Sequence, residues 1–105
     1  PQDADAYYMR AEAYYDLGQY ERAIQDYGDA IWLDPLDADA YYNRGISYYY
    51  LGQYDLAIQD FDEAIWLNPQ YAFAYYMRGL TYERLGKSTE AELDIAKAKE
   101  LGFDP

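Results

Sequence analysis

Cysteine and histidine are both missing from the 105 residues of this chain. Their absence excludes a thiol nucleophile, a disulfide bond, an imidazole base and a Cys/His zinc site. The apolar runs are short, and none approaches the roughly 18 residues that a membrane-spanning helix needs. The glycines are single residues, so they cannot form a phosphate-binding loop. We therefore predict that the chain is not an enzyme and binds no cofactor.

Basic residues are also scarce, with 8 Lys and Arg against 20 Asp and Glu and a formal net charge of −12. That charge repels nucleic acids and anionic membranes, so we expect neither as a partner, whereas a basic partner is attracted. The alternative is that the acidity only keeps the protein soluble. Acidic residues at 3–5 and 37–39 lack the Gly and distal Glu of a calcium loop, so we predict no metal site. No signal peptide is visible, and we favour a cytoplasmic location.

What the chain has in abundance is repetition. The stretch LGQYERAIQDYGDAIWLDP at 17–35 returns as LGQYDLAIQDFDEAIWLNP at 51–69, an offset of 51 − 17 = 34 residues. A fixed period of this length predicts a stack of structural repeats. It divides the chain into units 4–37, 38–71 and 72–105, preceded by the remnant of an upstream repeat at 1–3.

Each unit has the pattern of two helices. Apolar and aromatic residues recur at helical spacing, Gly18, Gly52 and Gly86 interrupt each unit near its middle, and prolines at 35 and 69 end the second helices. We expect six helices in three antiparallel pairs, no strand, N-caps at Asp3 and Asp37, and a cap at Ser88. Small residues of the first helices should face alanines of the second helices, with larger core residues beside them: Ala11, Gly45 and Gly79; Ala23, Ala57 and Ala91; Tyr27, Phe61 and Ile95.

A set of residues in the second unit resembles the tetratricopeptide repeat (TPR), a 34-residue helix–turn–helix unit: Tyr41, Gly45, Tyr48, Ala57, Phe61, Ala64 and Pro69. The resemblance covers essentially the whole chain. It implies an all-α fold in which three helix-turn-helix TPR units stack as a right-handed superhelical solenoid. It also implies a protein–protein interaction module.

One departure from the family pattern repeats in every unit. Arginines stand where the family usually has an apolar residue, and each unit carries an aspartate in phase on its second helix: Arg10 and Asp26, Arg44 and Asp60, Arg78 and Asp94. This spacing predicts a bidentate pair that joins the two helices of a unit. The alternative is two independent, solvated charges.

The resemblance implies a concave groove lined by the first helices. Its expected lining is Tyr8, Met9 and Tyr15, then Asp39, Tyr42, Asn43 and Tyr49, then Phe73, Tyr76 and Met77, with Asp5, Glu12 and Glu83. Tyr and Met suit peptide binding, so we expect a partner peptide with apolar anchors and basic residues. The alternative is that these tyrosines only pack between repeats. Some TPR domains hold a peptide carboxylate with Lys, Arg and Asn, and of these only Asn43 is matched here.

The two ends of the array differ. Glu92, Lys99 and Glu100 replace apolar residues that we expect to pack against a following unit: Ile24 and Ile58, Ile31 and Ile65, Trp32 and Trp66. This substitution predicts a polar C-terminal capping face. The first helix, with Tyr7, Arg10 and Tyr14, should expose a face suited to a neighbour, so we expect a monomer or weak self-association there. The competing function is a structural or self-assembling scaffold, natural or engineered, without a ligand.

Overall fold

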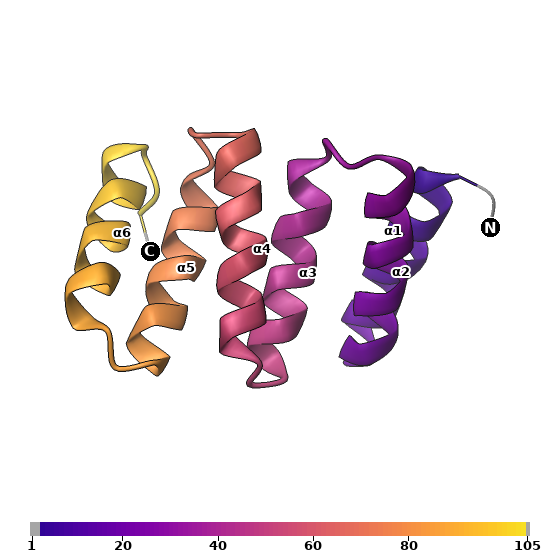
Figure 1. The fold of residues 1–105 in the computed structure, drawn as a ribbon, viewed down its shortest axis with the longest axis horizontal. Helices are drawn as coiled ribbons and strands as arrows, with labels where there is room; N and C mark the ends of the chain where they lie inside the picture. Colours follow the sequence, from indigo (N-terminus) through magenta and orange to yellow (C-terminus); the bar gives the residue numbers. More distant parts are fainter. Residues whose placement is uncertain (1–2, 105) are drawn as a thin grey trace.

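The computed structural model describes residues 3–104, and in that range the chain forms helices and no strand. The helices are α1 (Ala4–Asp16), α2 (Tyr20–Leu33), α3 (Ala38–Tyr50), α4 (Tyr54–Leu67), α5 (Ala72–Arg84) and α6 (Ser88–Glu100). Consecutive helices run antiparallel, and the three pairs stack side by side into an array of 42 × 25 × 21 Å (Figure 1). The all-α repeat solenoid expected from the sequence is confirmed. Residues 1 and 2 of the expected upstream remnant lie outside the described range.

The helix ends follow simple capping chemistry. The Asp3 carboxylate accepts a hydrogen bond of 2.8 Å from the amide of Ala6, and Asp37 accepts bonds from the amides at the start of α3. The predicted cap at Ser88 is wrong. Ser88 is the first residue of α6, and the N-cap is Lys87, whose ammonium side chain has no acceptor to offer the helix amides.

The three mid-unit turns share one conformation. Gly18, Gly52 and Gly86 have φ of +74°, +75° and +75°, a region that side chains rarely adopt. In each turn the next amide donates 2.9 Å to a carbonyl five residues back, which closes the end of the helix. This is why each unit folds back into an antiparallel pair.

The core lies between the two helices of each unit. Ala23, Ala57 and Ala91 are buried as predicted, together with Tyr27 and Phe61. The predicted core residue of the third unit, Ile95, is only half-buried. A Cβ on Gly45 would lie 2.7 Å from the Phe61 ring, so the small residue makes room for this ring, and a Cβ on Gly79 would lie 3.2 Å from the carbonyl oxygen of Ala91, the alanine that it was expected to face.

The predicted Arg–Asp pairs are present in all three units. Each arginine donates from Nε and Nη2 to the two carboxylate oxygens, at 2.6 and 2.8 Å for Arg10, 2.8 and 2.8 Å for Arg44, and 2.7 and 2.7 Å for Arg78. Arg78 also donates 2.9 Å to Asp62 of the preceding unit, a contact between units that the sequence did not predict. The pairs therefore join helices within units, and one of them joins units as well.

The prediction that the two tryptophans pack against a following unit is wrong. Trp32 and Trp66 do not pack against the following unit, because their side chains are 85% and 80% exposed. Each stands one position, or about 100° around the helix, beyond an isoleucine. Ile31 is buried and Ile65 half-buried, so the isoleucines occupy the inner face and the indoles point outward.

Candidate functional site

The predicted groove residues come from the first helix of each unit, and polar contacts join these helices to one another. Asn43 Nδ2 on α3 donates 2.6 Å to the hydroxyl oxygen of Tyr8 on α1. Arg84 Nε on α5 donates 3.3 Å to the hydroxyl oxygen of Tyr49 on α3. The structure therefore brings the predicted residues Tyr8 and Asn43 together, and it places Tyr49 beside Arg84, which was not among the predicted groove residues.

Aromatic rings cover two of the three equivalent tyrosines of the groove. The ring of Tyr71 lies 4.9 Å from that of Tyr42. In the third unit the ring of Phe103 lies 4.4 Å from Tyr76 and 5.0 Å from Phe73. The sequence analysis missed both covering residues. For Tyr71 a signal was present, because this aromatic residue replaces the aspartate that stands 34 residues earlier, Asp37.

The tyrosines at the other end of the first helices pack among themselves. Tyr15 lies 5.5 Å from Tyr20 and 6.2 Å from Tyr50, and Tyr49 lies 5.6 Å from Tyr54. For Tyr15 and Tyr49, packing within and between units thus accounts for much of the ring surface. Tyr50, which the sequence reading left out, is more exposed than either.

The more open residues of the predicted groove are its acidic residues and two large apolar residues. Met9 is 67% exposed and Phe73 54% exposed, whereas Met77 is half-buried. Asp39 is exposed and accepts a hydrogen bond from the hydroxyl of Tyr71. Met9 and Phe73 therefore leave apolar surface open on α1 and α5, and Asp39 leaves a carboxylate open on α3.

The pKa values of two groove tyrosines are raised by burial, and that of Tyr8 also by nearby negative charge. The pKa of Tyr8 is raised to about 12, first by burial and then by the negative charges of Glu12, Asp39 and Asp37. Burial likewise raises the pKa of Tyr42 to about 12. The potential at Tyr8 is therefore negative, and a cation placed there would be stabilised.

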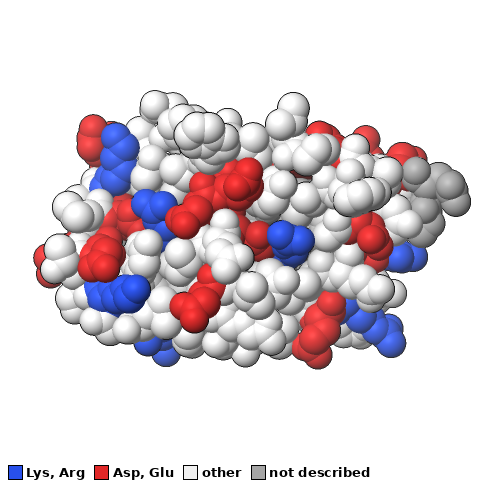
Figure 2. All heavy atoms as spheres, in the orientation of Figure 1, with Lys and Arg blue, Asp and Glu red and all other residues white. Residues whose placement is uncertain are grey.

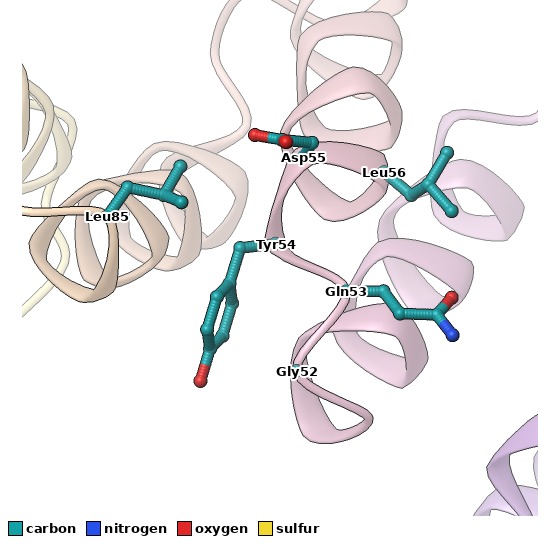
Figure 3. Close-up of a pocket in the computed structure, with 6 residues that line it drawn as sticks. All are labelled: Gly52, Gln53, Tyr54, Asp55, Leu56 and Leu85. Carbon is teal, nitrogen blue, oxygen red and sulfur yellow. The ribbon is translucent and has the colours of Figure 1, made fainter.

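Surface hollows also occur away from the predicted groove, and one beside α1 and α2 is lined by Arg10, Arg22, Asp26 and Asp29 among others. Figure 3 shows another of about 320 Å³ at the turn between α3 and α4, lined by Gly52, Gln53, Tyr54, Asp55, Leu56 and Leu85. Tyr54 and Leu85 lie on one side of the turn, and Gln53 and Leu56 point to the other. Within residues 3–104 no three acidic side chains cluster as metal ligands would, and no helix has the length and apolar character to cross a membrane.

Comparison with known proteins places the repeats in a family. Models of the tetratricopeptide repeat match residues 38–71 and 61–93, and a model described as TPR repeat matches 11–52. The second TPR of Spaghetti (RPAP3), solved with an HSP90 peptide, is 33% identical, with a TM-score of 0.92 over 95% of this chain and 93% of that one. The chain belongs to the TPR family.

Other TPR structures are similar along nearly the whole chain. The TPR domain of Arabidopsis OM64 is 28% identical, with a TM-score of 0.94 over 96% of this chain and 84% of that one. MamA is 35% identical with a TM-score of 0.91, and this chain spans 58% of its length. No curated protein matches the chain. TPR relatives are protein-binding modules, which places this chain in the same broad class.

Proposed function

We propose that the groove along α1, α3 and α5 binds a peptide segment of a partner protein that carries an aromatic or aliphatic anchor beside Lys or Arg. The observation that carries the proposal is that TPR domains about a third identical to this one, with the same fold, were solved with a bound peptide. The exposed side chains of Met9 and Phe73 supply apolar contacts on the corresponding helices.

The chain's own side chains indicate which anchor fits. Tyr71 covers Tyr42, and Phe103 covers Tyr76, so an aromatic ring packs well against the tyrosine at this position. The first unit has Asp37 where the second has Tyr71. An aromatic side chain from a partner would therefore fit against Tyr8, beside carboxylates that favour a neighbouring cation.

An acidic peptide is a poor ligand for the same surface. The peptide SRMEEVD in the RPAP3 structures carries three acidic side chains and a terminal carboxylate. In this chain Asp5 and Asp39 are exposed on the first helices, and Asn43 is already bonded to Tyr8. Like charges repel, so this TPR domain should select a basic partner instead.

Calorimetric titration of the full chain with a short peptide containing one Phe flanked by two Arg tests the proposal. Met9→Ala should weaken binding about fivefold, because one exposed contact of this size contributes about 1 kcal/mol. Leu93→Ala, on α6 outside the groove and 67% exposed like Met9, is the matched control and should leave this affinity unchanged. Equal binding of SRMEEVD, or no effect of Met9→Ala, would contradict the proposal.

Weak self-association through the first unit is a separate part of the proposal. The Arg10 side chain is 47% exposed, against 24% for Arg44 and 20% for Arg78, each of which lies beside a residue of the preceding unit. A front-to-front contact would close as a symmetric dimer. Light scattering across a concentration series should show a monomer when dilute and association that Tyr7→Glu removes. Association that survives this change would refute the assignment.

A further inference from the structure

The two tryptophans of the chain form, with one carboxylate each, a second surface that peptide binding in the groove does not use. Trp32 lies near the end of α2 and Trp66 at the same place in α4, and both are more than three-quarters exposed. Asp29 and Glu63 precede them by three residues on the same helix. At this spacing the Cβ atoms of the two residues lie about 5–6 Å apart, so carboxylate and indole are neighbours on the helix surface. These four residues are called the tryptophan face.

The tryptophan face runs along one edge of the array. The connections from α2 to α3 and from α4 to α5 lie at the upper edge of Figure 1, and both tryptophans stand just before them. In Figure 2 the central part of this edge is covered mainly by uncharged residues, with acidic residues below it. Leu36, in the first of these connections, is also well exposed. An exposed apolar strip with an acidic border is typical of an interaction surface.

The interior of the same protein shows which group completes such a pair. The guanidinium of Arg44 lies 5.8 Å from the ring centre of Tyr41 while it bonds to Asp60, and that of Arg78 lies 5.5 Å from Tyr75. Aromatic ring, carboxylate and guanidinium thus occur together in every unit. Within residues 3–104 neither Asp29 nor Glu63 forms an ion pair, although Asp29 lines a hollow that Arg10 and Arg22 also line. The tryptophan face therefore offers the ring and a carboxylate without a bonded cation, and tryptophan is the strongest aromatic partner for a cation.

The third unit supports this interpretation. At its two corresponding positions Lys97 and Glu100 replace the carboxylate and the tryptophan, and they pair with each other at 3.6 Å. In that unit the chain supplies its own cation. In the first two units no such cation is present at these positions.

We propose that the tryptophan face binds an arginine-bearing segment of a partner protein, with one guanidinium stacked on each indole and bonded to Asp29 or Glu63. Two occupants of this face can be compared by their charge, namely a second copy of the chain and a basic segment of a partner. A second copy would bring another −12, and three of its arginines are already engaged with aspartates. A basic segment meets attraction instead. Guanidinium groups also stack on aromatic rings and bind carboxylates through two donors, which ammonium groups do not.

The geometry of the array sets the spacing of the arginines. Two helix-packing steps of about 8–10 Å each separate α2 from α4, so the indoles lie within roughly 20 Å of each other. An extended peptide covers about 3.3 Å per residue, so arginines six residues apart reach both sites. Because two tryptophans bury less surface than a standard interface, we expect micromolar to millimolar affinity.

Fluorescence titration of the full chain tests the proposal directly, because its only two tryptophans are the ones on this face. The probe is a Gly/Ser peptide with two arginines six residues apart, and the control peptide replaces both arginines with glutamine. The arginine peptide should change tryptophan emission saturably, with binding that weakens as salt rises. The glutamine peptide should have no effect. No saturable change with the arginine peptide, or an equal change with the glutamine peptide, would overturn the proposal.

Variants separate this surface from the groove and from other occupants. Asp29→Asn with Glu63→Gln should weaken the arginine peptide at least threefold, whereas Met9→Ala in the groove should not. Trp32→Ala with Trp66→Ala should abolish its binding in calorimetry and leave the Phe/Arg groove peptide bound. Sedimentation in which the tryptophan double variant abolishes a dimer would contradict the proposal in favour of a second copy. A comparable emission change with zwitterionic lipid vesicles would contradict it in favour of a membrane surface.

Discussion

Removing Arg44 should destabilise the domain far more than its partly exposed position suggests. The Asp60 side chain is 6% exposed, and both of its oxygens are bonded to Arg44 at 2.8 Å. Arg44→Met keeps the apolar stem of the side chain but leaves that carboxylate buried and unpaired. Breaking a buried pair in this way costs about 3–5 kcal/mol. Since Arg44 is 24% exposed, water can enter, so we expect the lower end, about 3 kcal/mol.

Urea denaturation followed by circular dichroism measures this cost. About 3 kcal/mol is a large share of the roughly 5–15 kcal/mol that stabilises a typical domain. Asp60→Leu in the Arg44→Met background should recover most of the loss, because two apolar residues need no partner. Arg10→Met is the matched control, and its effect should be smaller because Arg10 is 47% exposed. A loss below about 1 kcal/mol for Arg44→Met, or no recovery in the double variant, would refute the reasoning.

Two further predictions concern the same scaffold. Gly28→Asp should stabilise the chain more than Gly28→Ala in urea denaturation. A Cβ there lies 3.6 Å from Arg44 Nη1, so the new carboxylate repeats the bond between Arg78 and Asp62; equal effects would contradict this. Tyr8 and Tyr42 have pKa values of about 12 against 10.0 when free, so the unfolded chain releases these protons first. Their contribution to stability is therefore intact below pH 10 and lost between about pH 10 and 12. Tyrosinate absorbance should rise together with loss of helix, and full ionisation of an intact helical chain would contradict the shift.

The sequence predicted the repeats well because each local signal agreed with the others. The 34-residue period, the glycines at the turns and the Arg–Asp spacing all depend on periodicity alone. Gly18, for example, stands where only a residue tolerant of positive φ closes the turn. The pairing of Arg44 with Asp60 follows from two residues kept in phase on adjacent helices.

The errors arose where direction around a helix decided the outcome. Trp32 was expected to be inside because it is apolar, yet one residue of helical rotation places it outside Ile31. The contacts of Phe103 depend on Gly102, whose φ of +101° redirects the chain after α6. The 34-residue period specifies neither which way the Trp32 side chain points around its helix nor the backbone angle φ of Gly102. The groove residues were proposed from family resemblance, and their role in binding stays a prediction.

The most direct test of the central proposal is to map where a basic–aromatic peptide binds. An NMR titration of the isotope-labelled full chain with the Phe/Arg peptide reports each side chain separately. Our account predicts the largest shifts on α1, α3 and α5, at Tyr8, Met9 and Asn43 above all, with smaller changes at Trp66. Shifts confined to α2 and α4, with the first helices unaffected, would contradict the assignment of the groove.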